Sequence, residues 1–370
     1  MIPPLMDLSV SKPRRRILAL DGGGIMGVFS IEILARMEEL LREHTGNPNL
    51  ILADHFDFMA GTSTGAIIST FLAWGESVDR IRSLYHTESA KIFTRAPWWR
   101  LGAGIFEARQ LTQWLRNYFV EEDGSPALLG SQKLKTLLLM VMRNATTGSA
   151  WPLTNNPFAK YNASSNEECN LRLPLWQLIR ASAAAPVYFP AETIQLGRQT
   201  FSFIDGGITA FNNPALIAVL TAVLPAYNIQ WASGTDRLHV ISLGTGRLRV
   251  RVNERLRRWL SLLSYAAIVP AGLMDSISWE QDLLCRVLGD CRFGAPMDSE
   301  IGDLINSQSA PEFKRFSYVR YDHEFGIKEV EEAKKEFAGG FGLDNLRLIP
   351  YMTRKGREYA EKNVRIEHLL

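Results

Sequence analysis

Apolar and polar positions alternate along this chain in two regular ways. Short apolar runs have the composition of buried strands, and longer stretches repeat their apolar residues every three or four positions, as amphipathic helices do. We predict strands over 16–20, 56–60, 136–143, 192–196, 200–204 and 238–243, and helices over 25–42 and 65–74. Strands that alternate with helices in this way indicate an α/β sheet covered by helices.

The pattern changes in two places. The polar stretch 144–170 is long for a loop in a compact domain, so we expect it to be functional or to form a small insertion. Beyond residue 247 helical patterns dominate, over 253–269, 275–288, 328–337 and 353–363. We therefore predict a core over 15–247 and a mainly helical extension or cap over 248–370 that packs on this core.

Composition excludes several classes of protein. Of the 370 residues, 46% are hydrophobic and 22% are charged, which is typical of a globular protein. No apolar run approaches the roughly 20 residues that span a bilayer, and the first residues lack the apolar segment of a secretion signal. Three cysteines without metal-binding spacing and a net charge of +2 indicate neither a metal site nor a nucleic-acid polymer as partner. We expect a cytoplasmic protein that needs no cofactor.

The first chemical motif is the glycine-rich run DGGGIMG over 21–27, between a predicted strand and a predicted helix. Successive glycines let the backbone approach a ligand closely, and a helix N-terminus offers free N–H groups to an anion. Gly22, Gly24 and Gly27 also match the dinucleotide-binding pattern G-x-G-x-x-G. That interpretation requires a carboxylate at the end of the next strand, where this chain has Met59 to Ser63 instead.

The second motif, GTSTG over 61–65, lies between a predicted strand and a predicted helix. G-x-S-x-G in this context is a nucleophile elbow, in which a sharp turn presents the serine hydroxyl. Ser63 would be the nucleophile, and the Thr64 N–H could face the oxyanion that forms on the substrate. The alternative is a tight turn with an ordinary helix-capping serine.

A nucleophilic serine needs a base, and two candidates remain from the sequence. His55 and His239 begin strands whose far ends carry the motifs, so we place both at the opposite edge of the sheet. His323 follows the elbow in an order that a conventional hydrolase triad would allow. Asp205, at the end of a predicted strand and before two glycines, is the better candidate, although Asp-Gly-Gly is also a common turn.

Together these motifs resemble those of the patatin-like phospholipase family. The glycine run, the elbow and the Asp205-Gly206-Gly207 sequence appear in the family's order, with similar blocks at RASAAAPVYFP over 180–190 and SLGTG over 242–246. The resemblance covers roughly 15–247 and implies a three-layer α/β/α sandwich, to which the helical pattern beyond residue 247 adds a C-terminal extension. It also implies that Ser63 and Asp205 form a catalytic dyad without histidine. Many members have Arg or Lys where this chain has Met26, which puts cationic help to the oxyanion in doubt.

The implied reaction is hydrolysis of fatty-acyl esters of membrane phospholipids. Asp205 would take the Ser63 proton, while the N–H groups of Gly22, Gly23 and Gly24 would hold the oxyanion. Because an ordinary aspartate is a weak base, we expect a dry site that raises its pKa. The segment 93–100, with paired tryptophans and arginines, is a candidate for peripheral membrane contact or a buried aromatic corner. The arginine-rich stretch 247–258 could hold anionic lipid headgroups or another phosphate ligand, or form a solvated helix face.

The segment WPLTNNPFAKYN over 151–162 resembles a second group, the patatin-like effectors of bacterial CBASS antiphage defence, which a cyclic nucleotide activates. A cyclic dinucleotide is therefore an expected activator. Two other functions remain open: a soluble esterase or thioesterase that uses Ser63 with His323, and a non-catalytic nucleotide sensor that binds phosphate at the glycine run. The sequence does not indicate an oligomeric state.

Overall fold

The computed structural model describes residues 12–92, 106, 108–163, 165, 167–248, 262–305, 314–336 and 345–370. The segment predicted at 93–100, and the basic stretch beyond residue 248, lie outside these residues. Arg247 and Leu248 are described and form the short strand β8 (Arg247–Leu248), which pairs with β11 (Glu324–Phe325).

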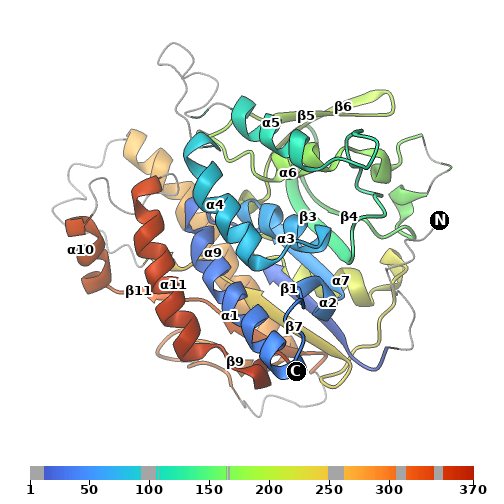
Figure 1. Ribbon diagram of the computed structural model, residues 1–370. Helices are drawn as coiled ribbons and strands as arrows, with labels where there is room; N and C mark the ends of the chain where they lie inside the picture. Colours follow the sequence, from blue (N-terminus) through green and yellow to red (C-terminus); the bar gives the residue numbers. More distant parts are fainter. Residues whose placement is uncertain are drawn as a thin grey trace.

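A mixed sheet runs through the molecule (Figure 1). Its strands follow the order β5-β6-β3-β2-β1-β7-β10-β9, and β4 also pairs with β3. Their bounds are β1 (Arg15–Leu20), β2 (Phe58–Thr62), β3 (Leu137–Asn144), β4 (Ser149–Thr154), β5 (Glu192–Leu196), β6 (Gln199–Asp205), β7 (Leu238–Leu243), β9 (Asp290–Phe293) and β10 (Ser317–Tyr321). The strands from β3 to β9 in this order are parallel, whereas β4, β5 and β6 pair antiparallel.

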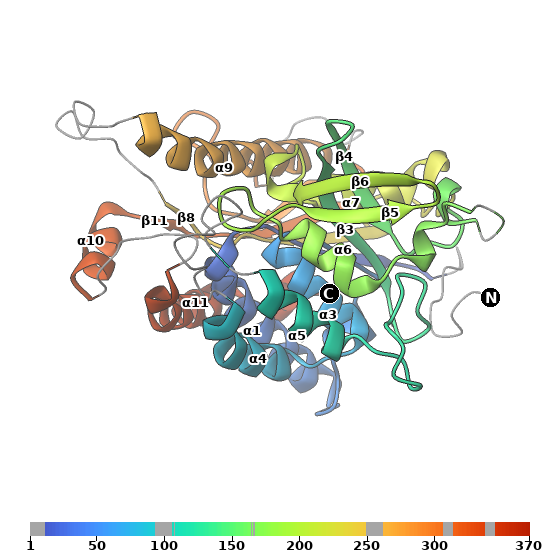
Figure 2. The same ribbon diagram turned by 90° about the horizontal axis from the view of Figure 1, so that it is seen from above.

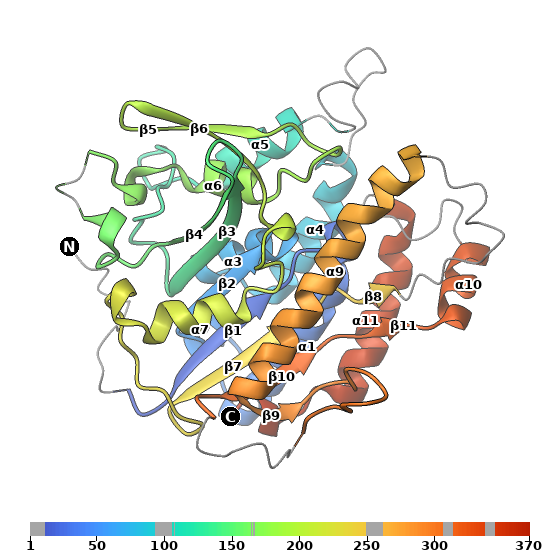
Figure 3. The same ribbon diagram turned by 180° about the vertical axis from the view of Figure 1, so that it is seen from behind.

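Helices cover both faces of this sheet, which gives three layers (Figure 2). One face packs against α1 (Gly27–Thr45), α3 (Thr64–Trp74), α4 (Val78–Ile92), α5 (Ala108–Tyr118), α6 (Leu175–Ser182) and α11 (Ile349–Asn363). The other face packs against α7 (Ala215–Val223) and α9 (Leu262–Leu288), which Figure 3 shows side by side. The remaining helices are α2 (Leu52–His55) and α10 (Ile327–Glu336).

The apolar runs form strands because both faces of the sheet are buried. In β1, Leu18 and Leu20 face one helical layer, and Ile17 and Ala19 face the other. Continuous apolar strands of this kind are typical of parallel sheets covered on both sides. The predicted three-layer α/β/α fold is therefore confirmed, and its core strands lie within two residues of their predicted positions.

Several elements differ from the sequence prediction, and the helices α4, α5, α6 and α7 were not predicted. The polar stretch after β3 contains the strand β4, which hydrogen-bonds to β3 and was not predicted. The C-terminal part contributes β9 and β10 to the main sheet, in addition to the expected helices. Helix α9 continues through 270–274, where we predicted a break between two helices. The strand β10 was not predicted because the charged Arg320 interrupts its apolar pattern.

Candidate active site

The predicted chemical motifs meet at the carboxyl edge of the parallel strands. Asp21 and the glycine loop follow β1, Ser63 follows β2, and Asp205 ends β6 where that strand pairs with Met142 of β3. Ligands of open α/β sheets bind at this edge, because loops from neighbouring strands converge there. The strand order thus joins residues that are far apart in the sequence.

The turn at Ser63 has the geometry of a nucleophile elbow. Ser63 has φ 54° and ψ −123°, a conformation that non-glycine residues rarely adopt and that is often found at functional sites. Glycine is required on both sides by close contacts. A Cβ on Gly61 would lie 2.2 Å from the Gly65 carbonyl oxygen, and a Cβ on Gly65 would lie 2.1 Å from the Leu20 carbonyl oxygen.

The Ser63 hydroxyl donates a hydrogen bond to Asp205. The distance from Ser63 Oγ to Asp205 Oδ2 is 2.6 Å, and both side chains are buried. The other carboxylate oxygen, Oδ1, accepts the Gly207 N–H at 2.7 Å, and the Asp205 N–H donates to the Ala184 carbonyl oxygen at 2.9 Å. Asp205 is therefore held rigidly, with one oxygen aimed at the serine.

Burial raises the pKa of Asp205 to about 6, although the hydrogen bonds from Ser63 and Gly207 and the charge of Arg180 act in the opposite direction. Arg180 is itself fully buried at the end of α6, and its Nη2 donates to the Pro190 carbonyl oxygen at 2.7 Å. A carboxylate whose pKa lies near neutrality is a better proton acceptor than an ordinary aspartate, yet remains ionised at pH 7 to 8.

The glycine loop lies against the elbow. A Cβ on Gly22 would lie 3.1 Å from the Ser63 Cβ, and the Thr64 Oγ1 donates to the Gly24 carbonyl oxygen at 2.8 Å. The Gly22 N–H already donates to the Asn212 carbonyl oxygen at 3.2 Å, whereas within the described residues the N–H groups of Gly23 and Gly24 have no protein acceptor. Position 26 is a buried methionine, which carries no charge, so it places no cation beside the loop.

Two polar residues beside this site were not assigned a role from the sequence. Ser182, at the end of α6, accepts the Ser63 N–H at 3.0 Å and donates to the Val141 carbonyl oxygen at 2.5 Å. Asn212 donates to Ser278 of α9 at 2.8 Å, and its side-chain oxygen lies close to Gly22 and Gly207. The only sequence signal for Ser182 was its place in the block over 180–190.

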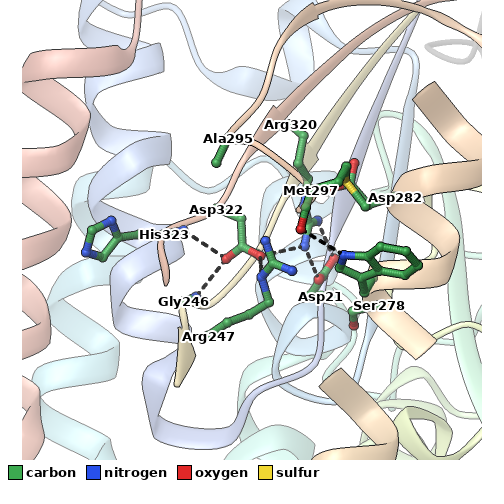
Figure 4. Close-up of polar contacts among 12 residues, drawn as sticks. Asp21, Gly246, Arg247, Ser278, Asp282, Ala295, Met297, Arg320, Asp322 and His323 are labelled. Carbon is green, nitrogen blue, oxygen red and sulfur yellow. Dashed lines mark hydrogen bonds and ion pairs between the residues drawn. The ribbon is translucent and has the colours of Figure 1, made fainter. Parts of the chain in front are cut away.

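All six histidines lie in the described residues, and none hydrogen-bonds to Ser63. His55 and His239 lie at the amino end of the sheet, as predicted, where their Nε2 atoms contact the carbonyl oxygens of Leu369 and His368, both at 2.9 Å. His323 packs against Phe29 and pairs with Glu329 at 3.2 Å. Figure 4 shows the His323 ring pointing away from the residues around Asp21.

The segment 151–162 begins beside the site, where Trp151 pairs with Met142 of β3, and runs toward the other end of β3, where Thr154 pairs with Leu139. Asn155 accepts the Leu138 N–H at 2.8 Å, and Asn162 donates to the Thr154 carbonyl oxygen at 2.7 Å. Buried asparagines thus hold this loop, while the rings of Phe158 and Tyr161 remain exposed. A ligand at these rings would act on the site from a distance.

The fold and this site define a class of protein. A family model described as patatin-like phospholipase matches residues 18–219, which is more than half of the chain. The chain belongs to the patatin-like phospholipase family.

Its relatives carry several names. The chain is 33% identical over 248 residues to Patatin-like protein 4 of Arabidopsis thaliana, covering 62% of this chain and 59% of that protein. It is 31% identical over 246 residues to a cGAMP-activated phospholipase of Escherichia coli (strain TW11681), covering 65% of each. It is 28% identical over 287 residues to Probable inactive patatin-like protein 9 of Arabidopsis thaliana, covering 72% of this chain and 71% of that protein. The chain therefore spans less than two thirds of the length of the first and second of these relatives.

No helix among the described residues is both long enough and apolar enough to cross a membrane.

Proposed function

We propose that this protein is a phospholipase that cleaves fatty-acyl esters with Ser63 as nucleophile and Asp205 as general base. The observation that carries the proposal is the 2.6 Å hydrogen bond from the Ser63 hydroxyl to the Asp205 carboxylate. It joins a strained elbow to a buried carboxylate with a raised pKa of about 6. This combination is typical of an activated nucleophile and its base.

The reaction follows from these positions. Ser63 Oγ attacks the ester carbonyl carbon as its proton passes to Asp205 Oδ2, and the free N–H groups of Gly23 and Gly24, with that of Thr64, stabilise the resulting oxyanion. When the tetrahedral intermediate collapses, the leaving alcohol takes the proton from Asp205 and an acyl group stays on Ser63. Water then attacks this acyl group and loses a proton to Asp205. As the second tetrahedral intermediate collapses, Asp205 returns this proton to Ser63 Oγ and the fatty acid leaves.

Covalent labelling with a fluorophosphonate probe tests the nucleophile directly. We expect one labelled residue, Ser63, and loss of both labelling and fatty-acid release from phospholipid vesicles in Ser63→Ala. Ser69→Ala is a matched control, because this buried serine on α3 hydrogen-bonds to the Ala66 carbonyl oxygen of its own helix and not to Ser63 or Asp205. Fatty-acid release that persists in Ser63→Ala would overturn the proposal.

The same assay separates the two alternative functions. A soluble esterase with a Ser63 and His323 pair would lose activity in His323→Ala, and we expect that variant to stay within a few-fold of the parent because His323 does not contact Ser63. A non-catalytic nucleotide sensor would show no acyl-enzyme with any ester.

We propose further that a cyclic dinucleotide raises this activity, as in bacterial antiphage defence. Support comes from the similarity to the cGAMP-activated phospholipase and from the segment 151–162, whose exposed Phe158 and Tyr161 could stack on bases. Titrating cyclic dinucleotides against vesicle hydrolysis should raise kcat at saturation, whereas the linear dinucleotide of the same bases should not. Full activity without any nucleotide, unchanged on titration, would contradict this.

Because the proposed substrate is a membrane lipid, the active protein would contact the membrane peripherally. We propose the cytoplasm as its place of action. Vesicle sedimentation with and without the cyclic dinucleotide tests the membrane contact.

A further inference from the structure

A buried cluster of charges surrounds Asp21, the residue that precedes the glycine loop (Figure 4). Arg320 of β10 donates to both carboxylate oxygens of Asp21, from Nη1 to Oδ1 at 2.9 Å and from Nη2 to Oδ2 at 2.6 Å. All three charged side chains of its centre, Asp21, Arg320 and Asp322, are at most 4% exposed. A paired fork of this kind fixes the orientation of the carboxylate as well as its position.

The strand order makes this contact possible. Arg320 lies beside Ser242 of β7, and Ser242 lies beside Ala19 of β1, so the guanidinium reaches across one strand to the residue after β1. On the way Nη1 also donates to the Ser242 hydroxyl at 2.7 Å. Asp21 immediately precedes Gly22, and Arg320 lies outside the residues 18–219 that match the family model.

The other side of Arg320 holds a second loop against the first. Its Nη2 donates to Asp322 at 3.1 Å, and Asp322 also accepts the Gly246 N–H at 3.1 Å and pairs with Arg247 at 2.9 Å. In that second loop Thr245 packs onto the glycine loop so closely that a Cβ on Gly23 would lie 2.1 Å from its Oγ1. The two loops are therefore braced by one guanidinium.

The charge of Arg320 is needed where it lies. Burial raises the pKa of Asp21 to about 6 even with Arg320 in place, whose charge and hydrogen bonds act in the opposite direction. Removing Arg320 would leave a buried carboxylate without its cation, and Asp21 would then take up a proton near neutral pH or turn toward water. Either change would release the strand end that carries Gly22.

We propose that Arg320 is a positioning residue, which holds the backbone of the glycine loop in place through Asp21. The effect of Arg320 on catalysis rests on the proposed phospholipase function, in which the N–H groups of Gly23 and Gly24 face the oxyanion. The effect of Arg320 on the position of the loop is independent of that function.

The test compares four proteins with the parent: Arg320→Met, Arg320→Lys, the double variant Asp21→Asn with Arg320→Met, and the control Arg286→Met. Arg286 is an equally buried arginine that pairs with Asp282 on α9 and does not contact the glycine loop. The double variant removes both charges, so it separates loss of position from the presence of an unpaired buried charge. Thermal unfolding, kcat, KM and amide hydrogen exchange of the peptide 18–27 are measured for each.

We expect the amides of 22–26 to exchange faster in Arg320→Met than in the parent. The same variant should lower kcat by about 10- to 100-fold and change KM by less than about three-fold, because the loop acts on the transition state. Arg320→Lys should recover part of the loss, since it restores the charge but not the fork. The double variant should regain thermal stability without regaining kcat. Arg286→Met should lower the unfolding temperature while leaving loop exchange and kcat unchanged.

Loop exchange at the parental rate in Arg320→Met, or parental kcat in the double variant, would overturn the proposal. If the parent itself hydrolyses no ester, the phospholipase function fails, and the exchange of 22–26 still decides whether Arg320 holds the loop.

Discussion

Asp205→Asn should separate activity from stability. Asparagine keeps the size of the side chain and can still accept a hydrogen bond from Ser63, but it cannot take a proton at neutral pH. Loss of a general base should lower kcat by about 10²- to 10⁴-fold. The variant should nevertheless fold, because the same change removes a buried charge.

The gain in stability can be worked out from the pKa of Asp205. Burial raises this pKa from 3.8 to about 6, so the folded protein binds the proton more tightly than the unfolded chain does. The stability that comes from this proton is fully present below the unfolded pKa and is lost as the pH rises through the folded pKa. At about 1.4 kcal/mol for each pKa unit, the loss is roughly 3 kcal/mol at pH 8 and about half of that at pH 5.

Asparagine does not titrate in this range. The stability of Asp205→Asn relative to the parent should therefore rise by roughly 1.5 kcal/mol between pH 5 and pH 8. Urea unfolding at both pH values measures this difference. Asp21 also has a raised pKa of about 6, but it is present in both proteins and its contribution cancels. If the variant and the parent differ in stability by the same amount at both pH values, the raised pKa of a buried Asp205 is refuted.

The pH dependence of activity alone does not identify the base. An aspartate with a pKa of about 6 loses activity on acidification in nearly the same range as a histidine with an unperturbed pKa of about 6.5. The decisive pair is therefore Asp205→Asn against His323→Ala. Activity that survives in the first and disappears in the second would refute the dyad.

Two further variants test how the elbow is held. Ser182→Ala removes the acceptor of the Ser63 N–H and should lower kcat by about 10-fold or more with little change in KM, measured beside Ser69→Ala as a control. Gly65→Ala places a Cβ 2.1 Å from the Leu20 carbonyl oxygen and should destabilise the fold by at least about 2 kcal/mol in urea unfolding. Gly272→Ala is its control: a Cβ at this helical position meets nothing within 4 Å, so stability should rise by up to about 1 kcal/mol.

Local patterns in the sequence determined the central strands, the helices α1, α3, α10 and α11, and the two glycine-containing motifs. Local sequence reflects local structural requirements. Apolar runs occur where both faces of a strand are buried, and glycine occurs where a Cβ would clash with a neighbouring carbonyl oxygen. This is why the strand before Gly22 and the turn at Ser63 could both be predicted. The strands β4 and β10 were missed because polar residues, among them Arg320, interrupt the expected pattern.

Only the tertiary structure decided which side chains meet. Asp205 contacts Ser63 across 142 positions of the sequence, Ser182 contacts it across 119, and Arg320 contacts Asp21 across 299. Such contacts depend on the order of strands in the sheet and on which ends of the strands share an edge, and no local pattern encodes either. The raised pKa of Asp205 arises in the same way, because burial is a property of everything that packs around the carboxylate. The sequence therefore determined which groups could react, and the packing of the sheet determined which of them lie within reach of one another.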